Sequence, residues 1–364
     1  MGADFRAPIT WKGSASYSRR VTDWLALSGT LLASETRRNY QYFDRNLRDD
    51  AVFTLDGEQG RSVFVPASTI PATGRTTARF AYKNPEFTHV LELVSTGRAR
   101  SRSAVVEGAV ALPRGGQARA SYTYNRSRDN STFSCCIART ASLLTPVKSD
   151  PRDLSGSWGP SDYDFRHKAM VYADVPLGFG VTLGARYVGA SGRPFSLTVN
   201  GDINGDDYAS NDLAFVFDPD DPNTPPDVAA AMRRLLANER SIARDYVRAN
   251  LGRIADRNAG TAPWTHRVDV RVAKRVTTLG SQAAELIVDV YNFANLLDSR
   301  WGGQYLLPQG ISASNPTTQQ LPLLNVVGFD QVTRRYRYMV NESVGVLRKR
   351  GDPYQLQLGL RYVF

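Results

Sequence analysis

Polar and apolar residues alternate along much of this chain with a period of two. In the last eleven residues, one set of alternate positions is entirely apolar and carries aromatic rings at both ends: Tyr354, Leu356, Leu358, Leu360, Tyr362 and Phe364. The positions between them are mainly polar: Gln355, Gln357, Gly359, Arg361 and Val363. Successive side chains of a β-strand point to opposite faces, so the pattern predicts a strand with one apolar and one polar face.

The same alternation recurs upstream. It is clear in 118–125, 163–175, 181–187, 264–272 and 284–291, and weaker in 8–20, 24–42, 73–83, 87–98 and 101–112. Together these segments predict about eleven antiparallel strands, most of them about ten residues or longer. Strands of soluble proteins average about five to six residues, whereas a tilted strand that crosses a bilayer needs about 9–11. Strand length therefore favours a membrane wall over a soluble β-sandwich, which would show the same alternation.

The connections between these segments fall into two classes. Five are tight and carry turn-forming residues, at 20–23, 84–87, 114–117, 176–179 and 278–282. Four are long, at about 43–72, 128–161, 193–262 and 296–352, and a further short link is predicted near Gly97–Arg100. Short turns at one end and long loops at the other are typical of transmembrane barrels. The predicted fold is an all-β antiparallel transmembrane β-barrel with short periplasmic turns and long extracellular loops.

One stretch inside the third long loop reads as helical. Apolar residues recur at near-helical spacing across 228–251, at Val228, Met232, Leu235, Ile242 and Tyr246. Asp227 is the predicted N-cap, Gly252 the predicted stop, and Asn238 a candidate break between two helices. We expect this helix to pack against its own loop.

Charge and composition add only a little. The 364 residues carry 45 Lys and Arg against 35 Asp and Glu, a net charge of +10. The arginines are scattered, which weakens a nucleic-acid interpretation. Arg19-Arg20 and the alternating Arg98, Arg100 and Arg102 are expected to line the lumen or to lie at turns. No apolar run reaches 18 residues, which excludes helical membrane spans.

Few residues are candidates for catalysis, metal binding or disulfide formation. The two cysteines, Cys135 and Cys136, are adjacent, so they form either a vicinal or intermolecular disulfide or two free thiols. With these and three histidines, His89, His167 and His266, we expect no metal centre and no cofactor. No phosphate loop, nucleophile elbow or zinc motif is present, so an enzyme is not expected.

The most acidic stretch lies between 202 and 227, with eight Asp and no Lys or Arg. Asp202-x-Asn204-x-Asp206 resembles the start of an EF-hand loop, but Asp207 and Leu213 stand where that loop needs Gly and Glu. Two interpretations stay open: loose calcium binding at extracellular concentrations, or, favoured here, a solvated acidic turn. On an extracellular loop the patch would also contact lipopolysaccharide through bridging divalent ions.

Four segments carry a family resemblance: Gly189–Phe195, Asp202–Asp206 with Asn211-Asp212, Asp289–Leu297 and Pro353–Phe364. They resemble the C-terminal half of the barrel of TonB-dependent outer-membrane receptors, specifically the Oar-like group. The last segment also resembles the general assembly signal read by the barrel assembly machinery, with Leu358, Leu360, Tyr362 and Phe364 as its key residues.

The resemblance implies an integral protein of a Gram-negative outer membrane. Such receptors have about 22 strands, a plug inside the barrel and a TonB-binding segment. We therefore expect residues 1–364 to be the C-terminal half of a larger receptor, supplying lumen wall and substrate-binding loops, with TonB engaged only through a plug that this chain lacks. Two alternatives stay open: a self-closing barrel that serves as a passive pore or adhesin, and a soluble sandwich that binds carbohydrate.

Overall fold

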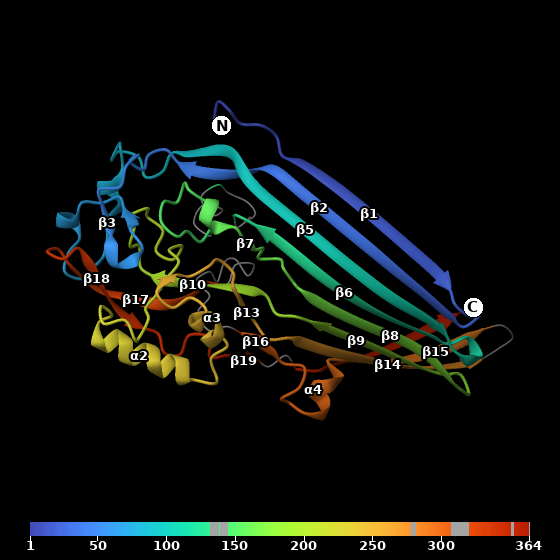
Figure 1. The fold of residues 1–364 in the computed structure, drawn as a ribbon. Helices are drawn as coiled ribbons and strands as arrows, with labels where there is room; N and C mark the ends of the chain where they lie inside the picture. Colours follow the sequence, from blue (N-terminus) through green and yellow to red (C-terminus); the bar gives the residue numbers. More distant parts are fainter. Residues whose placement is uncertain (132–137, 139–144, 278–281, 307–319, 351–352, 364) are drawn as a thin grey trace.

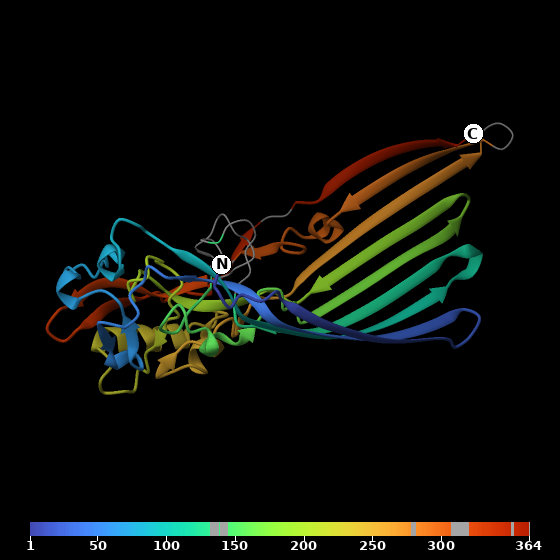
Figure 2. The same cartoon turned by 90° about the horizontal axis from the view of Figure 1, so that it is seen from above.

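The computed structural model describes residues 1–364 except 132–137, 139–144, 278–281, 307–319, 351–352 and 364. Its largest element is an antiparallel sheet in which nine strands follow one another in chain order. Figures 1 and 2 show them side by side in a long curved sheet, with most of the other elements gathered at one end. Across the sheet the strands are β1 (Ile9–Arg20), β2 (Leu25–Asp44), β5 (Leu91–Ala111), β6 (Gln117–Asp129), β8 (His167–Gly178), β9 (Val181–Ala190), β14 (Thr265–Thr277), β15 (Ala283–Tyr291) and β20 (Gln355–Val363). The two-residue β7 (Gly159–Pro160) pairs with the end of β6.

The register of this sheet, which we call the wall, sorts side chains by polarity. Leu358 of β20 lies opposite Val288 of β15, and Val288 lies opposite Val272 of β14. The next position along puts Arg271 opposite Asp289, with 2.6 Å between Nε and Oδ1. Because side chains alternate between faces, these pairs lie on opposite sides of the sheet. One face is therefore apolar and the other carries paired charges.

The apolar face of the wall is open. Leu360 retains 78% of its accessible surface, Leu31 63% and Val106 61%. In a soluble sandwich this face would be covered by a second sheet and would form the core. The described residues of both hydrophobic clusters lie outside the wall strands. The sandwich alternative is therefore wrong, and the apolar face is available to lipid.

The connections confirm the two predicted classes, with three corrections. β1–β2, β5–β6, β8–β9 and β14–β15 are hairpins at one end, the last closing partly outside the described residues. No link breaks the chain at Gly97–Arg100, because β5 runs unbroken for 21 residues. Segment 73–83 is not a strand: residues 78–81 form a 3-10 helix, and 84–87 lies in a long connection rather than a wall hairpin. These two errors account for the difference between the eleven predicted strands and the nine strands of the wall.

The long connections fold together at the other end of the wall, in what we call the cap. Its main sheet has the order β13-β10-β17-β18, with β10 and β17 parallel. The strands of the cap and its attached segments are β3 (Phe53–Leu55), β4 (Arg61–Val63), β10 (Pro194–Asn200), β11 (Phe215–Val216), β12 (Arg253–Ile254), β13 (Gly260–Thr261), β16 (Gln304–Leu306), β17 (Gln320–Asp330), β18 (Arg335–Val340) and β19 (Arg348–Arg350). Its α-helices are α2 (Pro226–Ala237) and α3 (Arg244–Arg248), whereas α4 (Phe293–Leu297) follows β15 and contacts the wall strand β14. Short 3-10 helices are η1 (Asp56–Glu58), η2 (Ala67–Thr69), η3 (Ala78–Ala81), η4 (Pro113–Gly115) in a wall turn and η5 (Ser155–Ser157).

The cap has its own hydrophobic core. Val63, Leu197, Met232 and Leu321, from four separate stretches of chain, are all at most 1% exposed and belong to one cluster. The sequence predicts loops in these regions and not the sheet that they build. Each stretch alone would leave its apolar side chains in water, so the stretches pack together into a folded cap. Burial contributes about 1.5–3 kcal/mol for each apolar side chain.

The predicted helical stretch is present and is divided as expected. α2 ends with Asn238 as its C-cap, and α3 follows after a short turn. Val228, Met232 and Leu235 face the core of the cap. The predicted N-cap is wrong, since Pro225 occupies that position and Asp227 lies in the first turn. In the part of the chain that the structure describes, no helix has the length and apolarity of a membrane span.

The two faces of the wall predict opposite responses to one substitution. Val171 of β8 lies among Ala120 and Tyr187 on the apolar face, and Tyr172 lies on the other face beside Arg119 and Arg186. We expect Val171→Arg to lower the free energy of unfolding in lipid vesicles by about 2–4 kcal/mol, because it puts a charge among acyl chains.

Tyr172→Arg is the matched control, since the charge enters a wet lumen, and we expect a loss of less than half that size. The readout is denaturant unfolding of the vesicle-inserted intact protein. Equal losses for the two variants would contradict the assignment of the faces.

Candidate functional site: a basic pocket between wall and cap

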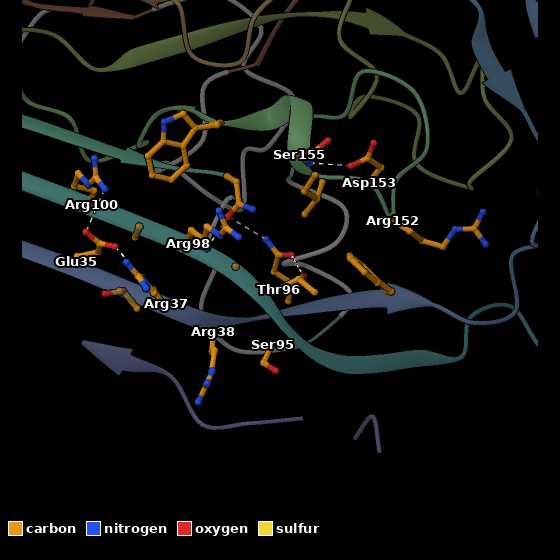
Figure 3. A pocket seen from close by; sticks show the side chains of 18 residues that line it. Glu35, Arg37, Arg38, Ser95, Thr96, Arg98, Arg100, Arg152, Asp153 and Ser155 are labelled. Atoms are coloured by element: carbon orange, nitrogen blue, oxygen red, sulfur yellow. Dashed lines mark hydrogen bonds and ion pairs between the residues drawn. The ribbon is translucent and has the colours of Figure 1, made fainter. Parts of the chain in front are cut away.

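A large pocket lies where the wall meets the cap. It has a volume of about 1070 Å³ and lies between the cap-side ends of β2 and β5 and the segment 152–158 (Figure 3). Its lining includes five arginines, Arg37, Arg38, Arg98, Arg100 and Arg152, against two carboxylates, Glu35 and Asp153. The pocket is therefore basic.

Irregular pairing of β2 and β5 creates the space. Their register shifts twice, between Arg37 and Asn39 and again between Asn39 and Gln41. Arg38 adopts a left-handed φ of 56° at the first shift. A bulge of this kind bends a strand and re-aims its side chains. Gly97 is required at this point, because a Cβ there would lie 2.7 Å from the backbone oxygen of Asn39.

A small polar network forms the floor of the pocket. The hydroxyl of Thr96 donates to Oε1 of Gln41 at 2.7 Å. Asn130, which is 8% exposed, accepts from the backbone N–H of Arg98 at 2.8 Å and from the amide of Gln41 at 3.4 Å. These bonds tie β2, β5 and the end of β6 together and leave the guanidinium groups as the main functional groups of the pocket.

The arginines are not equally free to bind a ligand. Glu35 accepts from Nε of Arg37 at 2.9 Å and from Arg100 at 3.2 Å, as Figure 3 shows. Arg152 is held by both carboxylate oxygens of Asp150, at 2.9 and 2.8 Å, and donates to the backbone oxygen of Asp49 at 2.9 Å. Arg152 is therefore a structural residue, and the others present charge to the pocket. Such groups suit a phosphate or carboxylate.

The acidic segment 202–212 is built into the cap. Asp202 accepts from the backbone N–H of Gly205 at 2.6 Å, and Asp206 accepts from the amide of Asn211 at 2.8 Å. Among the described residues no three His, Cys, Asp or Glu side chains are placed to hold a metal ion. Calcium can also be bound by backbone and amide oxygens, so calcium binding by this segment stays a prediction. The favoured interpretation, a solvated turn, is wrong, because Asp206 is 3% exposed.

Burial changes the ionisation of this segment. It raises the pKa of Asp202 to about 6 and that of Asp212 to about 7. Asp212 and Glu58 flank Arg61, which is 0% exposed; its Nε lies 3.1 Å from Glu58 Oε2, and its Nη1 lies 3.6 Å from Asp212 Oδ1. Tyr338 donates to Glu58 at 2.5 Å. The buried acidic residues thus hold three stretches of the cap together. Asp207, Asp220, Asp221 and Asp227 of the same acidic stretch are exposed, and contact of this patch with lipopolysaccharide stays a prediction.

His89 joins the wall to this segment, a role that the sequence does not reveal. Its Nδ1 lies 2.7 Å from Oδ2 of Asp44, the last residue of β2, and its Nε2 lies 3.2 Å from Oδ2 of Asp207. The ring stacks on Tyr208 with 5.1 Å between centroids. The hydrogen bond with Asp207, and then that with Asp44, raise the pKa of His89 to about 9.

The other predicted residues fall in different places. His167 and His266 lie on the apolar face of the wall, where they stack with Trp264 at 5.7 and 6.0 Å and form part of an aromatic band. Leu358, Leu360 and Tyr362 lie on the same face of β20. Phe364 and the pair Cys135-Cys136 lie outside the described residues. One feature of the sequence could have indicated the pocket: the alternation of polar and apolar residues breaks at Thr36–Asn39.

His89 predicts a pH dependence for the attachment of the cap. Its pKa is higher in the folded protein than the usual 6.5, so its contribution to stability is complete below about pH 6.5 and is lost as the pH rises through about 9. We expect up to about 3 kcal/mol of stability to disappear over that window, measured by hydrogen exchange of cap amides. His89→Gln removes this dependence and His266→Gln does not; an unchanged profile in His89→Gln contradicts the assignment.

Comparison with known proteins agrees with this architecture. Residues 1–298 match a family described as an outer membrane beta barrel domain. Among solved structures, the outer membrane transporter YddB from Escherichia coli is similar with a TM-score of 0.45 and 10% identity, over 99% of this chain and 33% of that one. The chain thus spans about a third of the length of that transporter, and no curated protein matches it. Because the family match covers most of the chain, this protein belongs to the outer-membrane β-barrel domain family and resides in the outer membrane.

Proposed function

We propose that this chain supplies part of the wall and the substrate-facing loops of a larger TonB-dependent outer-membrane transporter of the Oar-like group. The four family-like segments support the proposal by their positions. Gly189–Phe195 joins β9 to β10 and Asp202–Asp212 lies in the cap. Asp289–Leu297 joins β15 to α4, and Pro353–Phe364 contains β20. Three of the four therefore lie on or next to wall strands, and the fourth lies in the cap that those strands carry.

The direction of the two edge strands is the observation that carries the proposal. β1 and β20 stand at opposite ends of the sheet order and do not pair with each other in the described residues. Nine antiparallel strands place the first and the last in the same direction, and both run from the cap towards the turns (Figure 1). Bacterial single-chain barrels close through antiparallel pairs and have even strand numbers. An odd number of further strands therefore completes this barrel, as 13 more would in a barrel of about 22.

The open edges set an energetic requirement as well. Backbone N–H and C=O groups in hydrocarbon must be paired within protein, because each unpaired group costs several kcal/mol. All twelve residues of β1 are exposed, and so is the described outer side of β20. Additional strands remove both edges at once. A self-closing pore or adhesin would need a parallel seam between β1 and β20, so the alternative is less favoured.

In this proposal the parts have separate tasks. The polar face of the wall lines a lumen, and paired charges such as Arg271 with Asp289 keep it hydrated. The cap presents the surface that meets the substrate. A plug, contributed by the larger protein, contacts TonB and gates passage. Leu358, Leu360, Tyr362 and Phe364 form the signal for the barrel assembly machinery at the end of β20, which stays a prediction.

Crosslinking in the intact protein tests whether β1 and β20 meet. In a Cys135→Ser, Cys136→Ser background, Val288→Cys with Leu358→Cys places two thiols on directly opposed residues of β15 and β20. We expect a short bifunctional thiol reagent to join this control pair in the outer membrane. Leu358→Cys paired in turn with cysteines at 13–17 of β1 is expected to give no intramolecular crosslink, because other strands separate them. An efficient crosslink would contradict the proposal and favour the self-closing barrel.

A further inference from the structure

A second group of arginines begins at the edge of the basic pocket, with which it shares Arg100 and Trp158, and continues along β5 and β6 towards the wall turns. Arg100 lies directly opposite Arg128, and Arg102 lies directly opposite Arg126. We call these four residues the arginine block. Like charges on directly opposed strand positions repel each other and destabilise a sheet. Two such pairs in succession therefore favour the binding of a compensating anion.

The block lies on the outward face of the barrel. The register of β5 and β6 is unbroken from Ala99 to Ala111, so Arg100 and Arg102 share a face with Ala104 and Val106. On β6 the corresponding position beside the block is Tyr124, which lies opposite Ala104. This corrects the prediction that Arg100 and Arg102 line the lumen or a turn. The sequence could not settle it, because the apparent link at Gly97–Arg100 concealed the continuity of the strand.

The height of the block matches the edge of the membrane. From Arg102 to the turn at Leu112 the strand advances by about 33 Å at ~3.3 Å per residue. At a tilt of 35–45° this is about 25 Å of height, the thickness of the outward apolar band of such barrels. The block therefore begins where the apolar band ends, on the side of the cap. Aromatic rings of the same face, Tyr122 and Tyr124, lie just below it.

The block has little internal compensation. Arg100 contacts Glu35 at 3.2 Å, and Arg128 lies 5.5 Å over the ring of Trp158. Arg102 and Arg126 are exposed and form no ion pair with any described residue. The four arginines and Trp158 line a pocket of about 150 Å³, and Glu35, which contacts Arg100 from outside this pocket, is not part of its lining.

We infer that the arginine block binds the phosphorylated headgroup of an outer-leaflet glycolipid. A guanidinium binds phosphate through two parallel N–H donors, and four of them match a headgroup with two phosphates. Trp158 offers a flat face against a sugar ring, as aromatic side chains do at membrane interfaces. The apolar band directly below accepts the acyl chains of the same molecule. Free phosphate would use only the first of these contacts.

The test compares two variants of the intact protein in detergent. Arg102→Gln with Arg126→Gln removes the two unpaired charges. Arg119→Gln with Arg186→Gln removes two arginines from the opposite, polar face and serves as the control. Heat-modifiable migration confirms that each barrel is folded. The probes are lipid A with two phosphates, dephosphorylated lipid A, and inorganic phosphate as a competitor, with bound lipid counted by native mass spectrometry.

We expect the first variant to lose diphosphorylated lipid A by at least about tenfold, since each lost charge-assisted contact weakens binding several-fold. The control variant keeps wild-type binding, dephosphorylated lipid A binds weakly to all forms, and millimolar inorganic phosphate does not displace the lipid. Wild-type binding by the first variant overturns the inference. Equal binding of dephosphorylated lipid, or displacement by inorganic phosphate, overturns it too, because the site would then recognise acyl chains alone or any small anion.

Discussion

The pairing of every backbone group in the wall is the constraint on which the rest of this structure depends. A strand in hydrocarbon cannot leave N–H or C=O groups unpaired, so each strand must be bonded on both sides along its whole membrane length. From β2 to β15 the register meets this condition with neighbours in chain order. The period of two then assigns every second side chain to lipid and the remainder to water.

That constraint also explains where the hydrophobic core lies. A single sheet with lipid on one face and a wet lumen on the other has no interior to fill with apolar side chains. The core is instead in the cap, where Leu197 and Leu321 pair strands from distant parts of the chain. The buried Arg61 is held among Glu58, Asp212 and the backbone oxygen of Leu213, so the same region also contains the best-connected charges. The cap is in effect a folded layer attached to the ends of the wall strands.

The local sequence predicted most of the strands of the wall and little of the structure of the cap. Alternation is a local property, so β8, β9, β14, β15 and β20 were predictable from their own residues. β5 was misjudged because Gly97 suggests a turn, whereas the glycine serves a close approach to Asn39 across a bulge. The parallel pairing of β10 with β17 joins residues more than a hundred positions apart, and no local pattern encodes it.

The candidate sites also depend on long-range pairing that local sequence does not encode. The sequence singled out Asp202, Asn204 and Asp206 for their spacing, but their oxygens bond to backbone N–H groups and amides of their own turn and of Asn211. The basic pocket and the arginine block arise from cross-strand neighbours, so only the register could reveal them. His89 is a further case, because its partners Asp44 and Asp207 lie 45 and more than a hundred residues away.

Accessibility of spin labels along β20 and β15 tests whether one face of the wall contacts lipid and the other contacts water. Labels placed one at a time from 355 to 362 and from 284 to 290, in the membrane-inserted intact protein, report contact with oxygen dissolved in lipid or with a water-soluble nickel complex. We expect a strict period of two, with Leu356, Leu358 and Leu360 in contact with oxygen and the positions between them in contact with nickel. Uniform accessibility, or the opposite phase, would contradict it.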